Sequence, residues 1–169
     1  MKTLKSLAIR LAACVVLALP MAAWAQTAPP CRADRLALNT DDGQGRFNGM
    51  SQSGMVLTVT NRGDDVCSLS ARPILKFRDR DRKPLPITAR AQPGMRPGPV
   101  LLPIVVKPHA SVSSEIRWVS GNVYENGQCV SAAYVTLILD KGSIAAAMQG
   151  HFCGPSPGKP SYRASTFTP

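Results

Sequence analysis

Apolar and polar residues alternate along much of the chain, which is the period expected for β-strands with one buried face. In residues 53–60, Met55 and Leu57 fall on the same apolar face, with Val and Thr at the intervening positions. Residues 110–119 alternate in the same way, and Trp118 lies on their apolar face. We expect both segments to be half-buried antiparallel strands, with Trp118 packed in the core.

Further segments with strand character are separated by turns rich in Gly, Pro, Asn and Asp. No window of about ten residues shows a helical period. The chain is therefore predicted to be all-β, an immunoglobulin-like antiparallel β-sandwich of about seven to nine short strands stapled by disulfides. The expected strands cover residues 32–38, 53–60, 73–78, 100–106, 110–119, 130–139, 144–152 and 162–167.

The first residues have the form of a secretory signal peptide. Basic residues up to Arg10 precede an apolar run over residues 11–19, and Ala-Trp-Ala at residues 23–25 matches a small-x-small cleavage site. The apolar stretch is short for a membrane span, which needs about 20 residues. We expect residues 1–25 to be removed, leaving a single domain at residues 26–169 without a transmembrane segment, located in the periplasm or secreted.

The mature part of the chain is basic. Removing Lys2, Lys5 and Arg10 from the 20 Lys and Arg residues leaves 17 against 10 Asp and Glu, so the net charge falls from +10 to +7. Because the basic residues are spread along the sequence, we interpret this charge first as ordinary solubility charge and name no partner. The alternative is an anionic envelope component or another exported protein, since such a field favours anionic partners. The run at residues 79–84 mixes both signs, which predicts a solvated turn and no specific nucleic-acid surface.

The cysteines agree with export. Cys14 lies in the leader, and four cysteines remain after its removal: Cys31, Cys67, Cys129 and Cys153. No two of them have Cys-x-x-Cys spacing, so neither a zinc site nor a thioredoxin-like redox pair is expected. In an oxidising compartment four cysteines predict two disulfides, with three possible connectivities.

A predicted hairpin selects one of these connectivities. Asp-Lys-Gly at residues 140–142 suits a three-residue loop with Gly in the left-handed region. That register brings together three apolar pairs on one face: Val130 with Phe152, Tyr134 with Met148 and Ile138 with Ile144. It also places Cys129 opposite Cys153, within disulfide distance, and leaves Cys31 to pair with Cys67. The Cys129–Cys153 bridge falls on the opposite face from the apolar pairs, so we expect it to be less buried than a core disulfide.

No combination of residues indicates catalysis. His109 and His151 are the only histidines, and neither has the sequence context of a base beside a Ser or Cys nucleophile. Gly-Gln-Gly at residues 43–45 lacks the following helix and the Lys of a phosphate-binding loop. We therefore expect a protein that is not an enzyme, with no catalytic residues and no cofactor-binding residues.

A periplasmic copper-binding protein is the alternative function, because thioether and imidazole ligands suit copper. The candidate ligands are His109, His151, Met50, Met55, Met95 and Met148. They form no Met-x-x-Met or His-x-Met cluster, and Met55 and Met148 fall at positions predicted to face the core. We therefore expect no stoichiometric metal and name no metal ligand.

The segment at residues 61–73 resembles part of a known family. It contains Asn61-x-Gly63-x-x-x-Cys67-Ser68-Leu69, followed by Pro73 and an alternating strand that ends at Asp79. An early cysteine, Lys-Pro-His-Ala-Ser at residues 107–111 and two late cysteines complete the likeness. From Cys31 to about Phe167 the chain resembles bacterial domain-of-unknown-function family 4232 (DUF4232). Residues 70–73, Ser-Ala-Arg-Pro, depart from the Gly-aromatic-Pro that is usual in the family. The resemblance implies an exported β-sandwich, often a lipoprotein, with no known activity and no functional residues to transfer.

Overall fold

The computed structural model describes residues 28–90 and 100–169, and within these ranges the protein is all-β with no α-helix. Accordingly, no helix in the described part of the chain is long and apolar enough to cross a membrane. The expected signal peptide at residues 1–25 and the candidate ligand Met95 lie outside the described residues. The elements are η1 (Ala33–Arg35), β1 (Leu36–Asp41), η2 (Gly43–Gly45), β2 (Gln52–Asn61), β3 (Cys67–Leu69), β4 (Ile74–Arg78), β5 (Thr88–Ala89), β6 (Ile104–Val106), β7 (Ser111–Val119), β8 (Gln128–Ile138), β9 (Ser143–Gly154) and β10 (Ser161–Ala164).

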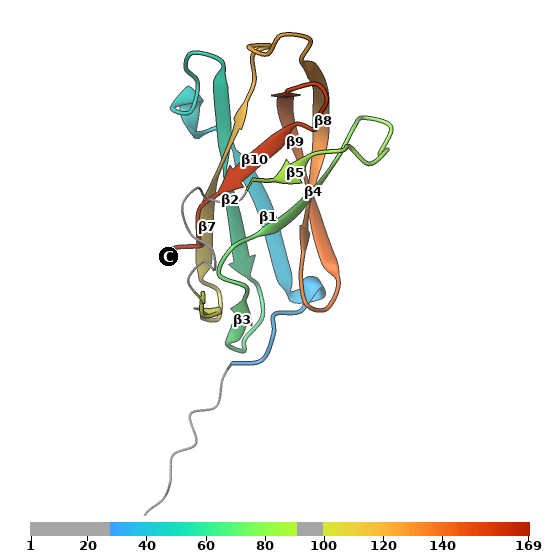
Figure 1. Ribbon diagram of the computed structural model, residues 1–169. Coiled ribbons are helices and arrows are strands. Elements are labelled where there is room, and N and C mark those ends of the chain that lie inside the picture. Colours follow the sequence, from blue (N-terminus) through green and yellow to red (C-terminus); the bar gives the residue numbers. More distant parts are fainter. Residues whose placement is uncertain (1–27, 91–99) are drawn as a thin grey trace, which may run out of the picture.

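The strands form two main sheets and a small ribbon (Figure 1). One sheet has five strands in the order β1-β2-β7-β10-β5, and the other has three in the order β4-β8-β9. β3 pairs with β6 in a two-stranded ribbon. All of these pairs are antiparallel except β10 with β5. The ten strands exceed the predicted number because β3 and β5 are too short for their alternation to be recognised in the sequence.

The alternation predicted for β2 and β7 matches the observed burial. On β7 the residues Val112, Ile116 and Trp118 are buried, whereas Glu115 and Arg117 between them are exposed. The apolar face of β2 is buried in the same way. The expectation that Trp118 packs in the core is confirmed, since its exposed fraction is 3%.

Four aromatic side chains join the two main sheets. The ring of Phe77 on β4 lies 4.9 Å from that of Phe152 on β9 and 5.3 Å from that of Tyr162 on β10. Trp118 stacks on Phe152 with ring centroids 4.5 Å apart. The backbone N–H of Leu75 donates a hydrogen bond of 3.0 Å to the Tyr162 hydroxyl. The short strand β10 is therefore attached to the opposite sheet by both packing and a buried hydrogen bond.

A buried asparagine organises the turn that follows β2. Asn61 is 1% exposed, and its side-chain amide donates to the carbonyl oxygens of Asp65, Val106 and Lys107 at 2.8–3.3 Å. Its carbonyl oxygen accepts from the Gly63 N–H at 3.0 Å. One side chain thus connects backbone carbonyls of the turn with those at the end of β6, where the Lys107 carbonyl also accepts from the Ala110 N–H. The Asn-x-Gly motif of the sequence has this structural role.

The cysteines form two disulfides at different parts of the sandwich. Cys31 joins Cys67 with Cα atoms 4.8 Å apart, and Cys129 joins Cys153 with Cα atoms 4.1 Å apart. This is the pairing expected from the hairpin register and by elimination. Cys153 is 2% exposed and Cys129 is partly exposed. The second bridge is thus half-buried, less enclosed than Cys31–Cys67, whose cysteines are both in the core.

The predicted register of the β8–β9 hairpin holds only at its cysteine end. Cys129 pairs with Cys153 and Val130 with Phe152 as expected, but Tyr134 pairs with Ala147 and Ile138 with Ser143. The predicted pairs Tyr134–Met148 and Ile138–Ile144 are therefore wrong.

The cause is a β-bulge in the middle of the hairpin. The register shifts between Ala132 and Tyr134, where two residues of β9, Met148 and Gln149, face the single residue Ala133 of β8. The turn also differs from the prediction, because the Leu139 N–H donates to the Gly142 carbonyl at 3.0 Å and closes a shorter loop. Beyond the bulge the inward positions of β8 change to Val135 and Leu137.

We predict that Tyr162 makes the fold sensitive to high pH. Burial raises the pKa of Tyr162, although its hydrogen bond with the Leu75 backbone opposes the shift. A tyrosine in the unfolded chain loses its proton near pH 10, while the folded protein still holds it. The free energy of unfolding should therefore fall as the pH rises above about 10.

Urea denaturation at about pH 9 and about pH 11 measures this fall. We expect a smaller fall in Tyr162→Phe than in the wild type. Tyr124→Phe, in the loop between β7 and β8, is the matched control and should behave like the wild type. An identical fall in wild type and Tyr162→Phe would show that the buried hydroxyl does not control alkaline stability.

Candidate functional site

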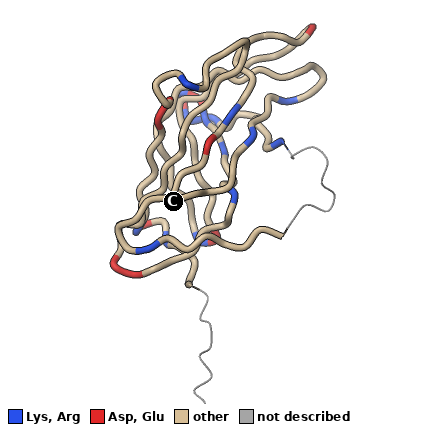
Figure 2. Tube along the Cα trace, turned by 90° about the vertical axis from the view of Figure 1, so that its left-hand side faces the viewer, with Lys and Arg blue, Asp and Glu red and all other residues tan. Residues whose placement is uncertain are grey.

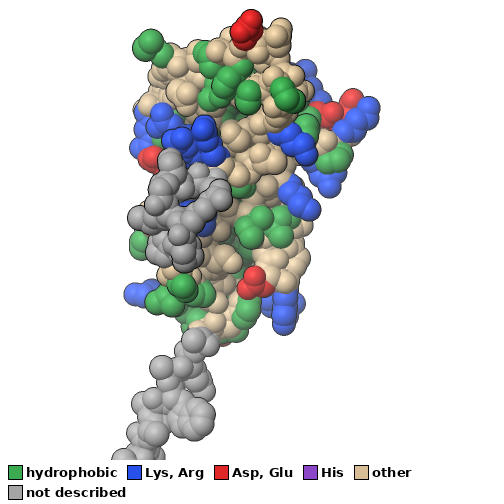
Figure 3. All heavy atoms as spheres, viewed as in Figure 1, with side chains coloured by type: hydrophobic (Ala, Val, Ile, Leu, Met, Phe, Trp, Pro, Cys, Tyr) green, Lys and Arg blue, Asp and Glu red, His purple; other side chains and the backbone are tan. Residues whose placement is uncertain are grey.

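Three arginines line one hollow on the outer face of the five-stranded sheet. Arg90, Arg117 and Arg163 surround a space of about 360 Å³ together with Gln52 and Ser161. Seen from the side, Lys and Arg positions gather on neighbouring strands in the upper half of the molecule (Figure 2). The space-filling view also shows Lys and Arg side chains grouped on the left of the upper half (Figure 3).

The strands place these side chains through their alternation. Arg117 lies between the buried residues Ile116 and Trp118 on β7, so it points out of the sandwich. Arg163 follows the buried Tyr162 on β10 and pairs directly with Arg117 across the antiparallel ladder.

Arg90 reaches the same hollow from the other side of β10. It follows directly after β5, and its backbone N–H donates to the Tyr162 carbonyl at 2.8 Å. The parallel pairing of β10 with β5 continues to this point, where Tyr162 faces Ala89. Three arginines that are far apart in the sequence thus come from three adjacent strands or strand ends.

The charge of this group is not compensated by acidic neighbours in the described part of the chain. Among the described residues, Arg90, Arg117 and Arg163 form no ion pair within 4.0 Å. Glu115, two residues before Arg117, pairs with Arg46 at 3.0 Å instead. Like charges placed directly opposite each other on two strands are destabilising. The Arg117–Arg163 pair is therefore a local cost to the fold and concentrates positive potential at the hollow.

An aromatic ring supports one of the arginines. The Arg117 guanidinium lies 5.1 Å from the centroid of the Phe47 ring, and that of Arg46 lies 4.6 Å from it. Phe47 is 3% exposed although it comes from the loop before β2. The ring can lie this close to the sheet because Gly54 has no side chain: a Cβ there would be 2.9 Å from Phe47 and 2.6 Å from the Ile116 carbonyl oxygen.

The hollow has the chemistry of an anion-binding site. Guanidinium groups present planar sets of donors that match the oxygens of a carboxylate or phosphate. The hydroxyl of Ser161 and the amide of Gln52 add neutral donors to the lining. Stacking on Phe47 restricts Arg117, so less side-chain entropy is lost when it binds a ligand.

The candidate copper ligands among the described residues are dispersed, and only Met148 and His151 share an element, β9. Met55 and Met148 are in the core, as expected, with exposed fractions of 4% and 8%, whereas Met50 is 99% exposed. His109 is in the turn between β6 and β7, where its Nε2 lies 3.1 Å from an Asp64 carboxylate oxygen. His151 lies on β9 and contacts Ser131 instead. Of the described residues in this set, Met148 and His151 line one hollow, whereas Met50 and His109 do not line it.

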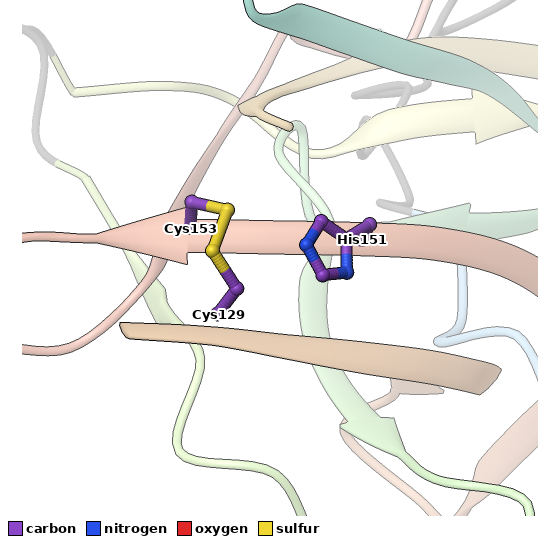
Figure 4. A group of neighbouring side chains, drawn as sticks. All are labelled: Cys129, His151 and Cys153. Carbon is purple, nitrogen blue, oxygen red and sulfur yellow. A yellow bond between two sulfur atoms is a disulfide. The ribbon is translucent and has the colours of Figure 1, made fainter. Parts of the chain in front are cut away.

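The structure does bring His151 close to one disulfide. One possible ligand atom from each of Cys129, His151 and Cys153 lies within 4.8 Å of the others. The imidazole stands beside the disulfide on the same side of the hairpin (Figure 4). The predicted cysteine pairing does not include His151, although a spacing of two residues on a strand places His151 and Cys153 on one face.

The sequence does not reveal the arginine group, because its basic residues are spread along the chain. The alternation in residues 110–119 does predict an outward Arg117. The alternation does not predict which strands lie beside residues 110–119, because β10 and β5 join the sheet by pairing with strands that are distant in the sequence. The expectation of dispersed charge is therefore wrong for Arg90, Arg117 and Arg163.

Comparison with known proteins identifies one family. A family model described as a domain of unknown function (DUF4232) matches residues 31–167. The chain belongs to this family. The match begins at Cys31 and ends at Phe167, so the resemblance stated from the sequence is confirmed over its whole range, and the DUF4232 region contains both disulfides. No curated protein and no solved structure matches the chain.

We predict that Arg163→Glu stabilises this DUF4232 domain. The substitution replaces a like-charge pair with an opposite-charge pair across β7 and β10, and such a cross-strand pair contributes roughly 0.2–1 kcal/mol. Because both side chains are exposed, we expect a rise of about 0.5 kcal/mol in the free energy of unfolding.

The matched control is Arg163→Gln, which removes the repulsion without adding an attraction. Its stability should fall between those of the wild type and Arg163→Glu in urea denaturation at low ionic strength. A loss of stability in both variants would mean that Arg163 supports the fold through contacts other than charge.

Proposed function

We propose that the protein is a non-catalytic, exported binding module that acts in the periplasm or after secretion. In this proposal residues 1–25 are a cleaved leader and residues 26–169 form the working domain. The two disulfides support an oxidising compartment, because such bridges form and persist mainly outside the cytosol. The leader itself rests on the sequence pattern alone.

We further propose that the sandwich is immunoglobulin-like. The order β1-β2-β7 in one sheet and β4-β8-β9 in the other corresponds to the A-B-E and C-F-G strands of that architecture. In this assignment β10 takes the place of strand D beside β7. The antibody-type disulfide between the sheets has no counterpart, since Cys129 and Cys153 join neighbouring strands.

The ligand that we propose is an anionic component of the cell envelope, bound through phosphate or carboxylate groups at the arginine hollow. The observation that carries the proposal is the direct opposition of Arg117 and Arg163, with Arg90 at the same hollow. Two opposed arginines cost stability, and they have no acidic partner among the described residues. An anionic ligand would supply the opposite charge and so explain why both arginines are present. An acidic surface of another exported protein would use the same donors.

Binding to lipid vesicles and to a carboxylated polymer tests this function. We expect wild-type protein to bind phosphatidylglycerol vesicles or alginate, to ignore phosphatidylcholine vesicles, and to lose affinity as salt is added. A basic side chain near an anionic surface contributes about 1 kcal/mol. Arg117→Ala/Arg163→Ala should therefore bind the vesicles about 30-fold more weakly.

The control removes two arginines from other places. Arg62→Ala/Arg80→Ala changes the net charge equally, and both residues are exposed in turns away from the hollow. We expect this variant to lose much less affinity. Equal losses in the two double variants would mean that only net charge matters, and the proposed site would then be wrong.

A further inference from the structure

The half-buried disulfide and the neighbouring histidine form a second group of chemically active side chains, separate from the arginine hollow. His151 precedes Cys153 by two residues on β9, and Cys129 faces Cys153 from β8. One ligand atom from each residue lies within 4.8 Å of the others (Figure 4). We propose that reduction of the Cys129–Cys153 disulfide creates a site for one Cu(I) ion, held by the two thiolates and the His151 imidazole.

The donor set selects the class of metal. Thiolate sulfurs are soft ligands that favour Cu(I), zinc and iron–sulfur clusters, and imidazole suits copper and zinc. A structural zinc site normally has four protein ligands. Among the described residues the group contains three, with no fourth His, Cys, Asp or Glu within the same distance. Cu(I) accepts a low coordination number, and it is the copper state that persists with a reduced dithiol.

The backbone already holds the ligands close together. The Cα atoms of Cys129 and Cys153 are 4.1 Å apart because the hairpin pairs these residues directly. Metal–sulfur bonds of about 2.3 Å, as found for zinc, require the two sulfurs to separate. Rotation of the side chains about Cα–Cβ provides this separation, while the ladder between β8 and β9 keeps the strands in place.

A hydrogen bond prepares the imidazole for this role. The Nδ1 atom of His151 lies 3.2 Å from the hydroxyl of Ser131, which faces it directly on β8. Metal-binding histidines commonly use one ring nitrogen for such a contact, and it fixes the orientation of the ring. Nε2 is then the nitrogen that binds the metal.

Solvent can reach the group from one side. His151 is exposed and lines a hollow of about 480 Å³ with Ser131 and Arg80. Cys129 is partly exposed, whereas both cysteines of the other disulfide are buried. A dithiol reductant therefore has better access to Cys129–Cys153 than to Cys31–Cys67.

The site forms by reduction of the disulfide followed by binding of the metal. A dithiol such as dithiothreitol attacks the sulfur of Cys129, Cys153 leaves as a thiolate, and closure of the reductant to its cyclic disulfide releases Cys129. The reductant supplies two electrons and two protons to the pair. Binding of Cu(I) then displaces the thiol protons to solvent, with no change in the oxidation state of the metal.

The test uses the full exported chain, reduced by dithiothreitol and freed of it by anaerobic gel filtration. Cu(I) is offered from its coloured complex with bicinchoninate. We expect the reduced protein to withdraw one Cu(I) per chain and the oxidised protein to withdraw none. His151→Ala should lose affinity by at least tenfold, and Ser131→Ala, whose effect is on ring orientation, by about tenfold.

Cys31→Ser/Cys67→Ser is the matched cysteine control and should still bind one Cu(I) after reduction, while Cys129→Ser/Cys153→Ser should bind none. Far-ultraviolet circular dichroism of each reduced protein checks that the fold is retained. Cu(I) binding by oxidised protein, unchanged affinity in His151→Ala, or failure of the folded reduced protein to bind would each overturn the site. Preference for Zn²⁺ with no affinity for Cu(I) would overturn the choice of metal.

Discussion

The contact of Tyr162 with the opposite sheet is the constraint on which the arrangement of the site depends. β10 has only four residues, and a strand this short has little stability of its own. Packing of the Tyr162 ring on Phe77 and the hydrogen bond from the Leu75 N–H attach it to the three-stranded sheet. Because side chains alternate along a strand, burying Tyr162 forces Arg163 outward.

The burial of Tyr162 in the core thereby determines where the arginines lie on the surface. Once Tyr162 is buried, the register of β10 against β7 places Arg163 opposite Arg117, and the pairing with β5 brings Arg90 to the same hollow. Phe47 closes over Gly54 and supports Arg117 from beneath. A rigid scaffold that holds three cations together without acidic neighbours among the described residues is suited to binding an anion, since the cost of ordering the donors is met during folding.

Much of the architecture follows from local pattern. Alternation located the long strands, and β7 illustrates why: every second residue from Val112 to Trp118 enters the core. The predicted pairing of Cys129 with Cys153 is right although the predicted loop is wrong, because the shorter loop and the bulge shift the register by one residue in opposite directions. The bulge opposite Ala133 could not be predicted, because a stretch of small residues gives no signal for an extra residue. The length of the hairpin loop could not be predicted either, because the bulge allows a two-residue loop to give the same pairing at the cysteine end.

The site was harder to predict than the fold because it depends on contacts between distant segments. Alternation predicts an outward Arg117, but the sequence does not indicate that β10 will lie beside β7. The spacing of His151 and Cys153 predicts that they share one face of a strand. They form a group of three only because Cys129 lies opposite Cys153. At the arginine hollow and at the disulfide with His151, the register between strands brings together residues that form no motif in the sequence.

In the proposed function, Arg90, Arg117 and Arg163 act together as an anion-binding site. Titration of the isotopically labelled protein with sodium phosphate, followed by NMR at the arginine Nε–Hε groups, tests it most directly. We predict that the signals of these three arginines shift together with one dissociation constant, while those of Arg62 and Arg80 change little. Shifts of similar size at all exposed arginines would contradict it, because they would show that phosphate responds only to the overall positive charge.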